Sequence, residues 1–513
     1  MVSIEKKIVM MRVAIRVDAS EEIGTGHFMR CLTLAKGLRA YGADVCFVVR
    51  HLLPHFQDLL IEQAVDLKIL YSQPALDGGS LKHSRWLGVT QQVDALQSID
   101  ALKDFAWDWL IVDSYSLDGD WESQMRSSNL FNKILAIDDL ADRHHICDLL
   151  LDQNLQQALD RYADLTPKTS IKLLGPKFSL LREEFRCLHK KVSPRVGEVK
   201  RILIFFGGID NKNYTLKVAN ILGNIKGADF HVDVVVGAAY GARSEIKELC
   251  VKYNFELHVQ IDYLADLMAK ADIAFGAGGG AIWERCCLGL PTFTIPLAEN
   301  QYIQVASSAA QGLLYEFIPS SDSVELENIE RHILGFLESS SLRQHISTRG
   351  LQVVDGLGVQ RILGAMGCSR LQVRLAAPDD SQMIFNWRNH PRIRQFSRSE
   401  EVIDQVDHEA WFTGVLKNPD RLLLIGLLGG VPIGVVRFDL DNNEAEVSIY
   451  LDPLNMNAGL GHDLLRSAEH YFSQKYSQIS LVANVLDLND TSDNLFRGCG
   501  YKIESKRFIK RLN

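Results

Sequence analysis

Two consecutive stretches of the chain alternate short apolar runs with amphipathic runs. The clearest apolar runs are 13–17, 45–49, 109–113 and 134–138 in the first stretch, and 201–206, 230–236, 273–275 and 292–295 in the second. Such alternation is typical of parallel β-sheets whose strands are connected by crossover helices. We therefore predict two Rossmann-type α/β domains, at residues 12–190 and 198–360, joined by a charged linker at 187–200. In sheets of this kind, ligands bind beyond the carboxyl ends of the strands.

A glycine-rich turn follows the first apolar run. The sequence IGTGH at residues 23–27 leads into residues 28–40, where apolar side chains recur at helical spacing. Gly24 and Gly26 allow a tight turn that brings backbone N–H groups to an anionic ligand. His27 adds a side chain that, when neutral, accepts a proton from water. Two interpretations remain open on the motif alone: a catalytic loop, or a helix cap beside a turn with an exposed histidine.

The second domain has glycines at the ends of two predicted strands. Gly207 and Gly208 follow its first strand, and residues 276–280, which include Gly278 and Gly279, follow a later one. Glycine lets the backbone approach a phosphate or a sugar closely. The alternative for the first pair is a plain strand-to-loop turn.

Polar side chains accompany these loops. Glu284 lies shortly after the second glycine run, where a carboxylate can accept hydrogen bonds from ribose hydroxyls or simply favour the start of a helix. Asn300 and Gln301 follow the strand at 292–295 and suit the hydroxyls and amides of a sugar, although asparagine also caps helices well.

A third group of polar residues resembles a metal site only by residue type. Its spacing fits no standard site, so we expect no bound metal and interpret it as a polar loop at a strand end. Its members are Asp138, Asp139, Asp142, His144, His145 and Cys147.

Length and composition indicate how many domains the chain has and which kinds of partner it lacks. A chain of 513 residues is expected to hold about three domains, and its net charge of −9 argues against a nucleic-acid-binding surface. Nine cysteines without a CxxC pair suggest a reducing, cytoplasmic location. No apolar run is long enough for a membrane span, so we expect no membrane partner. The sequence leaves the oligomeric state open.

The motifs of the first two domains together resemble a known family. IGTGHFMRCLTLA, GGID and GAGGGAIWERCCLGLP followed by ENQ are similar to the UDP-sugar hydrolases of pseudaminic acid biosynthesis, which are themselves similar to GT-B glycosyltransferases. The resemblance covers about residues 12–360 and implies metal-independent hydrolysis of UDP-2,4-diacetamido-2,4,6-trideoxy-β-L-altropyranose. It implies that His27 positions or deprotonates the water, that Tyr115 and Asn300 belong to the active site, and that Glu284 binds the ribose.

Residues 371–513 resemble the GNAT N-acetyltransferases, which are α/β domains. A strand at 445–451 precedes a glycine-containing loop and a helix, and in that family a splayed strand and such a loop bind acetyl-CoA. The family pattern has glutamine or arginine where this chain has Met456. The resemblance implies that acetyl-CoA, as cosubstrate, contacts Ile449, Leu451, Asn457, Gly459, Gly461, Asn489 and Phe496.

The acid–base residues of this third domain are less certain from the sequence. A frequent tyrosine acid is replaced by Phe496, so another group or water protonates the thiolate, or the domain is inactive. Glu446 is the nearest carboxylate for accepting a proton from an amine, although an exposed strand residue is nearly as good an interpretation. Arg388, in a predicted helix at 385–389, has the chemistry to meet a nucleotide phosphate.

The two resemblances together predict a GT-B-like pair of Rossmann-type domains followed by a GNAT domain. They imply one polypeptide that N-acetylates the 4-amino group of a UDP-4-amino-sugar and then hydrolyses the UDP-sugar product. The alternatives are a GT-B glycosyltransferase that uses the same cleft, and a third domain that only binds or assembles.

Overall fold

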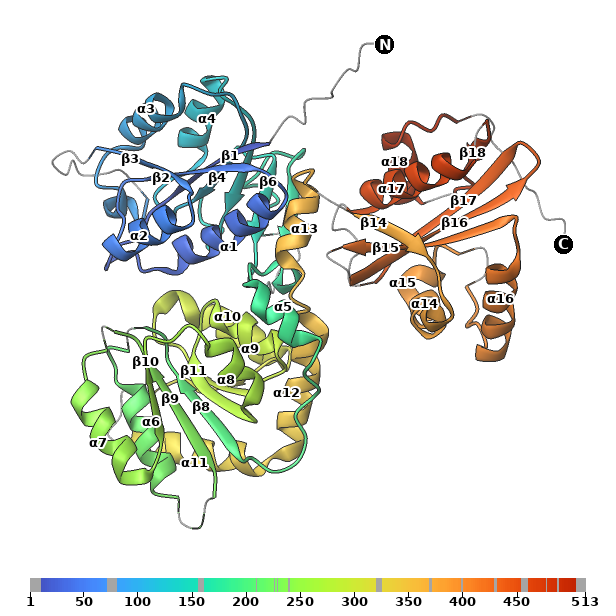
Figure 1. Ribbon diagram of the computed structural model, residues 1–513. Coiled ribbons are helices and arrows are strands. Elements are labelled where there is room, and N and C mark those ends of the chain that lie inside the picture. The colour runs from blue at the N-terminus through green and yellow to red at the C-terminus, as the bar shows by residue number, and fades with distance from the viewer. Residues whose placement is uncertain are drawn as a thin grey trace. The chain divides into compact units, whose positions relative to one another are not determined.

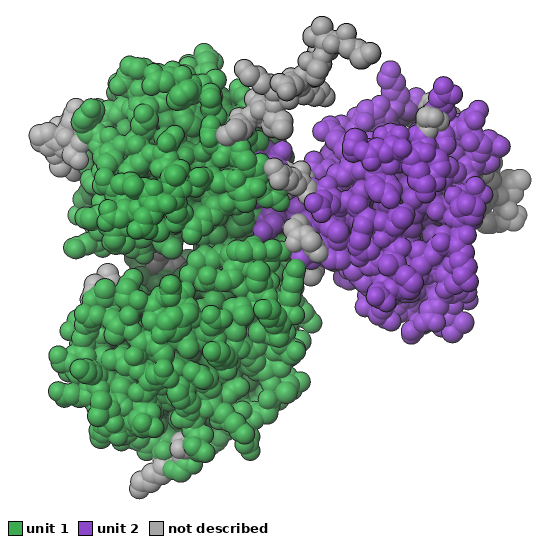
Figure 2. All heavy atoms as spheres, in the orientation of Figure 1, with its two compact units in different colours: residues 1–359 green, residues 360–513 purple. Residues whose placement is uncertain are grey.

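The structure is a computed structural model, and its residues divide into two compact units, 1–359 and 360–513 (Figure 2). Each unit is described by itself. The structure describes residues 11–71, 81–155, 161–208, 210–225, 227, 229–238, 240–319, 325–368, 371–397, 400–428, 431–453, 460–476, 478–486 and 489–503. Within these ranges, no helix is both long and apolar enough to cross a bilayer.

The first half of unit 1 is a seven-stranded parallel sheet with the order β3-β2-β1-β4-β5-β6-β7. Helices α1 and α2 lie on one face and α3 and α4 on the other (Figure 1). The strands are β1 (Arg12–Val17), β2 (Asp44–Val49), β3 (Asp66–Ile69), β4 (Trp107–Asp113), β5 (Phe131–Ile137), β6 (Leu149–Asp152) and β7 (Ile171–Leu174), and the helices are α1 (Gly26–Ala40), α2 (Pro54–Glu62), α3 (Gln91–Leu102), α4 (Gly119–Ser127) and α5 (Glu183–His189).

The strand order places a topological switch point between β1 and β4. The chain proceeds from β1 outward to β2 and β3, then returns to β4 and proceeds outward on the other side. The loops after β1 and β4 therefore diverge, and this divergence opens a crevice at the carboxyl ends of the two strands.

Helix α1 is fixed to the sheet by one apolar face. The residues at the predicted helical spacing, Phe28, Cys31, Leu32, Ala35 and Leu38, are all buried, as expected. Phe28 stacks on Phe56 of α2 with the ring centroids 4.3 Å apart. The packing of Phe28 thus fixes the first turn of α1, and with it the position of the preceding residue, His27.

The second half of unit 1 is a six-stranded parallel sheet with the order β10-β9-β8-β11-β12-β13. It repeats the switch point, now between β8 and β11. Its strands are β8 (Arg201–Phe205), β9 (His231–Val236), β10 (Glu256–Val259), β11 (Ile273–Ala277), β12 (Thr292–Ile295) and β13 (Tyr315–Glu316), and its helices are α6 (Tyr214–Gly223), α7 (Arg243–Tyr253), α8 (Leu264–Lys270), α9 (Ala281–Cys287), α10 (Glu299–Ala310), α11 (Glu325–Glu338) and α12 (Ser340–Val353).

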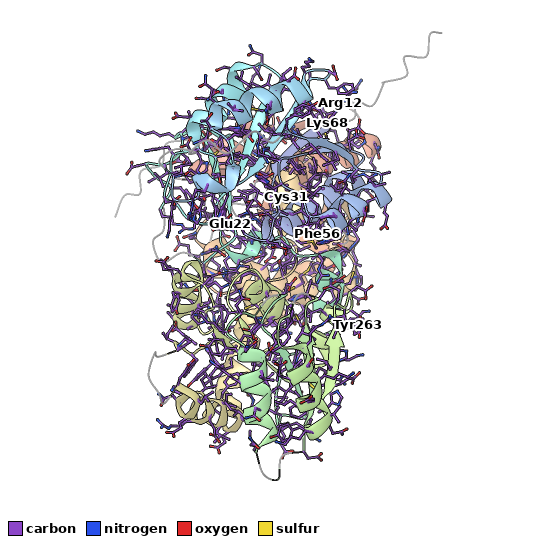
Figure 3. All side chains as sticks on the ribbon, turned by 90° about the vertical axis from the view of Figure 1, so that its left-hand side faces the viewer. Arg12, Glu22, Cys31, Phe56, Lys68 and Tyr263 are labelled. Atoms are coloured by element: carbon purple, nitrogen blue, oxygen red, sulfur yellow. The ribbon has the colours of Figure 1, made fainter. Side chains whose placement is uncertain are left out.

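The carboxyl ends of the two sheets face each other within unit 1. Arg12 begins β1 and Glu22 lies beyond its end, and Figure 3 shows Glu22 on the side of the second half and Arg12 on the far side. Tyr263, which follows β10, lies on the side of the second half that faces the first (Figure 3). The surface of unit 1 is indented where the halves meet (Figure 2).

Unit 2 contains a five-stranded sheet with the order β14-β15-β16-β17-β18, in which only the last pair is parallel. Helices α14 to α16 lie on one side of the sheet and α17 and α18 on the other (Figure 1). The elements are α13 (Gly358–Ala365), β14 (Gln372–Leu375), α14 (Ser381–Asn389), α15 (Pro391–Arg394), α16 (Gln405–Lys417), β15 (Arg421–Leu428), β16 (Val431–Asp441), β17 (Glu444–Leu451), α17 (Leu460–Lys475), β18 (Ser480–Val482) and α18 (Asp490–Gly498).

The structure corrects the sequence-based element boundaries in three places. Strand β5 ends at Ile137, so Asp138 already belongs to the following loop. The predicted linker at 187–200 begins inside α5, whose Phe185 is buried against the second half. Helix α13 begins at Gly358 and continues to Ala365, so it crosses the predicted end of the second domain at residue 360.

We expect truncation of Phe28 to destabilise unit 1. Phe28→Ala removes a fully buried ring between α1, α2 and β2, and such a change costs about 3–5 kcal/mol of unfolding free energy. Urea-induced unfolding of the full chain measures the effect. Ile61→Ala, at an exposed position on α2, should change the midpoint by less than about 0.5 kcal/mol, and an equal loss in both variants would contradict the packing argument.

Candidate active site

His27 and Asp113 meet at the first switch point. Val17 and Asp113 are register partners at the ends of β1 and β4, and His27 lies in the first turn of α1, directly after the loop that follows β1. The Nδ1 atom of His27 is 2.6 Å from Oδ1 of Asp113. Because a carboxylate can only accept, the proton lies on Nδ1, and the neutral imidazole keeps Nε2 as its free acceptor.

Arg30, one turn further along α1, holds the Asp113 carboxylate from the other side. Its Nε donates to Oδ2 at 2.6 Å and an NH2 group donates to Oδ1 at 2.7 Å. Burial alone raises the pKa of Asp113, but the charges of Arg30 and His27 outweigh burial, and its pKa lies well below the usual range. The Asp113 carboxylate is therefore ionised and accepts the hydrogen bond from Nδ1–H of His27.

Tyr115 closes the network from the end of β4. Its hydroxyl donates to Oδ2 of Asp139 at 2.8 Å, and the same oxygen accepts a 2.5 Å bond from Arg30. The tyrosine ring meets the His27 ring edge-on, with centroids 4.5 Å apart. Burial raises the pKa of Tyr115, so its hydroxyl stays protonated. The orientation of His27 is thus determined by Asp113 on one side and by Tyr115 on the other.

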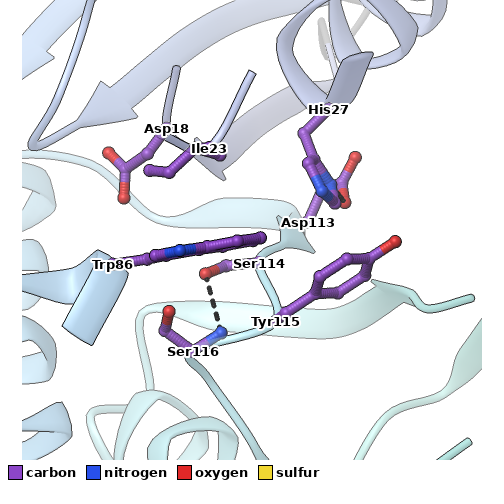
Figure 4. Close-up of a pocket in the computed structure, with 8 residues that line it drawn as sticks. All are labelled: Asp18, Ile23, His27, Trp86, Asp113, Ser114, Tyr115 and Ser116. Carbon is purple, nitrogen blue, oxygen red and sulfur yellow. Dashed lines mark hydrogen bonds and ion pairs between the residues drawn. The ribbon is translucent and has the colours of Figure 1, made fainter. Parts of the chain in front are cut away.

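A small cavity opens beside His27 (Figure 4). Its volume of about 10 Å³ is close to the minimum that holds one water molecule. Trp86, which lies in the short 3-10 helix Ser84–Leu87, forms one wall, stacked on Tyr115 with centroids 6.0 Å apart. The other residues that line it are Asp18, Ile23, Asp113, Ser114 and Ser116.

Asp18, the second carboxylate of the cavity wall, is occupied by structural contacts. It pairs with Arg16 at 2.8 Å and accepts hydrogen bonds from the backbone N–H groups of Arg50 and His51. These contacts tie the end of β1 to the end of β2. His27 is therefore the better acceptor for a proton from a molecule in this cavity.

The predicted glycine loops of the second half lie at its own switch point. Gly207 and Gly279 have φ angles of +94° and +84°, a conformation that side chains other than glycine rarely adopt. Gly208 lies so close to Gly237, at the end of β9, that a Cβ on Gly237 would be 2.3 Å from the Gly208 carbonyl oxygen. The sequence analysis did not identify this close contact, which fixes the loop after β8.

Glu284 lies in the first turn of α9 with 22% of its side chain exposed. Burial raises the pKa of its carboxyl, and Arg182 at 3.7 Å partly opposes that effect. Gln301 is less free than the sequence suggested, because its Oε1 accepts from the Leu297 N–H at 2.9 Å and its side chain packs against Gly278. Asn300 lies in α10, and its side chain is outside the described residues.

One ion pair joins the two halves of unit 1 near these loops. Nζ of Lys82 lies 3.5 Å from Oε2 of Glu299, between the segment before Trp86 and the start of α10. Both side chains are exposed, so this pair contributes little stability. It places the His27 cavity and the Gln301 region on facing sides of one crevice.

The sequence analysis nominated His27 and Tyr115 but assigned no role to Arg30, Asp113 or Asp139. Each of these partners lies at the end of a strand or within one turn of His27. That position in the sequence could have identified them as candidate site residues. Asp139 was counted only as part of the polar group at 138–147. Its actual partners are 109 and 24 residues away, on α1 and after β4.

The remaining members of that polar group support the fold. Asp138 accepts hydrogen bonds from the Ala141 N–H and from the Tyr162 hydroxyl and pairs with Arg143 at 2.8 Å. His145 contacts Glu122 at 2.8 Å in the buried interior. Asp138 and His145 are thus bonded to other residues of this half, and the interpretation as a loop without a metal stays a prediction.

In unit 2, strand β17 has one free edge. It pairs with β16 over its whole length but with β18 only from Glu444 to Glu446. The backbone from Val447 onward, which includes Ile449 and Leu451, lies beyond the last β17–β18 pair. That acetyl-CoA binds at this part of the strand, as the resemblance implied, stays a prediction.

The other residues predicted to contact acetyl-CoA are placed as follows. Gly461 lies in the first turn of α17, and the Asn489 side chain caps α18 by accepting from the Ser492 N–H. Phe496 is buried and meets Tyr501 edge-on. Asn457 and Gly459, like Met456, lie outside the described residues.

Comparisons with known proteins agree with this division. Residues 370–502 match the family model of the acetyltransferase (GNAT) domain. The chain is 25% identical over 311 residues to the UDP-2,4-diacetamido-2,4,6-trideoxy-beta-L-altropyranose hydrolase of Campylobacter jejuni, with 60% of this chain and 99% of the relative covered. It is 23% identical over 427 residues to the uncharacterized protein MJ1062 of Methanocaldococcus jannaschii, covering 81% and 80% of the two chains. That match is longer than unit 1 and so extends into unit 2.

Among solved structures, MurG of Acinetobacter baumannii is similar with a TM-score of 0.46 and 14% identity, over 70% of this chain and 99% of that one. The two parallel sheets and the GNAT match confirm the predicted fold class of two Rossmann-type halves followed by a GNAT α/β domain. The chain thus joins a region similar to a UDP-sugar hydrolase to a GNAT domain.

The buried His145 makes the stability of unit 1 depend on pH. Burial lowers its pKa, but the carboxylates of Asp138, 3.8 Å away, and Glu122, hydrogen-bonded at 2.8 Å, outweigh burial and raise the pKa to about 9. The stabilisation is therefore complete below the unfolded-state pKa near 6.5 and is lost as the pH rises through 9, at no more than about 1.4 kcal/mol per pH unit. Urea midpoints between pH 6 and 9.5 should fall more steeply for the wild type than for His145→Gln, and parallel curves would contradict this origin.

Proposed function

We propose that this chain is a bifunctional nucleotide-sugar enzyme. Unit 1, comprising domains at 12–190 and 198–360, hydrolyses a UDP-sugar to the free sugar and UDP. The domain at 371–513 acetylates an amino group of the preceding UDP-amino-sugar with acetyl-CoA. The observation that carries the first activity is the His27–Asp113 pair beside a water-sized cavity. The GNAT match carries the second.

In the proposed hydrolysis, Nε2 of His27 accepts a proton from a water molecule that attacks the anomeric carbon. Asp113 stabilises the imidazolium that forms, as its ionised carboxylate and the clamp of Arg30 allow. The bond between the anomeric carbon and the UDP oxygen breaks, and UDP leaves with the electron pair of that bond. Tyr115 holds the plane of the imidazole by its edge-on contact.

The second half of unit 1 is assigned to UDP. The backbone at Gly207, Gly208 and Gly279 leaves room for phosphate oxygens near peptide N–H groups, and Gly278, which packs against Gln301, is assigned to the same loop. Glu284, partly exposed near these loops, binds the ribose hydroxyls, and Asn300 contacts the sugar. Gln301 contributes to this site indirectly, because its side chain accepts a hydrogen bond from the Leu297 N–H and so fixes the loop before α10.

Gly24 and Gly26 let the loop before α1 approach the substrate from the first half. Gly24 has a φ angle of +81°, and open space surrounds the Cα atoms of both glycines. Since a side chain there would enter the crevice beside His27, we assign both positions to sugar contact.

In the proposed acetyl transfer, Glu446 accepts a proton from the acceptor amine, directly or through water. The free edge of β17 from Val447 onward fits an amide-bearing chain such as pantetheine, and Gly461 opens the helix that follows the loop. Acetyl-CoA would supply the acetyl group when bound: the amine nitrogen forms the amide bond, the thioester C–S bond breaks, and CoA leaves as a thiolate that takes a proton from water. Phe496 packs in the core of this domain and contributes shape there, since it has no proton to give.

The substrate is proposed by similarity to the Campylobacter jejuni hydrolase, whose name specifies UDP-2,4-diacetamido-2,4,6-trideoxy-beta-L-altropyranose. The acetyl-transfer substrate is then the corresponding UDP-4-amino-sugar, and both reactions belong to pseudaminic acid biosynthesis. We propose that no metal takes part in hydrolysis, because His27 and Asp113 supply the base. Among the described residues no disulfide bond is formed, which supports placing the enzyme in the cytoplasm.

A GT-B glycosyltransferase remains the second candidate, because a Rossmann-type pair with a UDP site serves both reactions. The two differ in the acceptor. Incubation of the full chain with the UDP-sugar and no other acceptor should release UDP and free sugar at a constant rate. Release only after addition of a sugar or lipid acceptor would favour the glycosyltransferase.

His27→Asn should lower the hydrolysis rate by about 10²–10⁴-fold, since it removes the proton acceptor, while UDP binding by calorimetry stays unchanged. His470→Asn, at an exposed position on α17, is the matched control and should leave hydrolysis unaltered. Hydrolysis at a near-normal rate by the His27 variant would remove the base assignment. EDTA treatment of the wild type should also leave the rate unchanged.

Glu446→Gln should lower acetyl transfer to the UDP-4-amino-sugar by about 10²-fold or more and should leave hydrolysis intact. Release of CoA and the mass of the product report the first activity, and release of UDP reports the second in the same preparation. Acetyl transfer that rises with pH to the wild-type level in the variant would show that the amine reacts without Glu446.

A further inference from the structure

Arg388 of α14 is a partly buried cation for which the described residues supply no counter-charge. Its guanidinium carbon lies 5.2 Å from the centre of the Trp411 ring of α16. Among the residues that the structure describes, none forms a hydrogen bond or an ion pair with it. A charged group in this situation is costly unless an anion reaches it, because burial removes water without supplying a partner.

A second arginine shares the same indole. The guanidinium carbon of Arg437, on β16, lies 5.8 Å from the Trp411 ring centre. Arg437 is paired with Asp439 through bonds of 2.9 and 2.8 Å, so its charge is largely compensated within the protein. Burial lowers the pKa of Arg388, and the charge of Arg437 lowers it further. Trp411 therefore holds two guanidinium groups near each other, and one of them lacks an anion.

The two arginines lie on the face of the sheet that carries Glu446. In the antiparallel register, Arg437 is opposite Ser448, and Asp439 is opposite Glu446. Side chains opposite each other point to the same face of a sheet, and those two residues apart on one strand do so as well. Arg437 is thus about 7 Å along the sheet from the proposed base.

Tyr450 extends this face towards α14. It is opposite Val435 and packs against the cluster that includes Ile384 and Phe412, and its hydroxyl has no hydrogen-bond partner among the described residues. The opposite face is covered by α17, where Phe472 stacks on Phe438. The face with Glu446, Arg437, Tyr450 and Arg388 is therefore separate from the side of the sheet where α17 packs.

We propose that Arg388, positioned by Trp411 beside Arg437, binds the diphosphate of the nucleotide-linked acceptor while its amine lies at Glu446; this rests on the proposed acetyl transfer. A guanidinium matches two phosphate oxygens at once, which a lysine does not. The diphosphate and the reacting amine are attached to opposite sides of the sugar ring, and the two protein sites are likewise separated along β16 and β17.

Direct binding tests this site independently of catalysis. Calorimetric titration of the full chain with UDP should show two sites in the wild type, one in each unit, and one site in Arg388→Gln. Arg392→Gln, at an exposed position on α15, is the matched control and should keep both sites. A single site in the wild type, or two in Arg388→Gln, would overturn the proposal.

Kinetics distinguish the two substrates that carry phosphate. Arg388→Gln should raise KM for the UDP-4-amino-sugar about 10- to 100-fold, leave KM for acetyl-CoA unchanged, and leave transfer to a nucleotide-free 4-amino-sugar unchanged. Arg388→Lys should recover only part of the loss. The unchanged KM for acetyl-CoA shows that unit 2 of the variant is folded, and UDP-sugar hydrolysis by the same preparation reports on unit 1.

Three outcomes of these assays have distinct meanings. A raised KM for acetyl-CoA with an unchanged KM for the acceptor would overturn the proposal, because Arg388 would then bind the CoA phosphates. Unchanged values for both substrates would overturn it as well. Two UDP sites without acetyl transfer by the wild type would refute the proposed activity and support the anion site.

Discussion

The hydrogen bond between His27 and Asp113 is the contact on which the first unit depends. It exists because the ends of β1 and β4 are neighbours in register while the chain leaves them in opposite directions, so the two side chains meet at the mouth of a crevice. Asp113 is almost completely buried, and an unpaired carboxylate there would be costly. Arg30 and His27 remove that cost. The interactions that stabilise the end of β4 are therefore the same ones that fix the imidazole.

The second half of unit 1 also has loops that meet at a switch point, and there they are held mainly through backbone contacts. At its switch point between β8 and β11, glycines at 207, 208 and 237 permit the close approach of neighbouring loops, and Glu284 lies partly exposed in the first turn of α9. Arg285 is buried beneath the loop after β11 and donates to the Ala277 carbonyl at 2.6 Å. A cation that acts on the protein's own backbone leaves the loop N–H groups free to face a ligand. In the proposed function, one half would thus provide an acid–base pair and the other a rigid cradle.

Local patterns predicted the elements of the fold well and the contacts of the site only in part. Strand β12 has the predicted bounds, because its apolar run ends abruptly at polar neighbours. Helix α5 was missed where its charged residues follow one another, although Phe185 anchors it. His27 and Tyr115 stand next to recognisable turns, whereas Asp139 reaches its partner Arg30 across 109 residues. Register and strand order create that contact, and neither is visible in the spacing of residues along the chain.

The proposed sites impose an order on the two reactions. If Arg388 binds the diphosphate of the acceptor, the acetyltransferase recognises a group that unit 1 removes. Hydrolysis before acetylation would deprive the acceptor of the anion that offsets the buried guanidinium, and the free amino-sugar would bind only through weaker contacts. Acetylation must then come first, and the hydrolase must discriminate against the free amine. The charge of the free amine would then set the order of the two steps, because the second unit removes that charge by acetylation before the first unit receives the sugar.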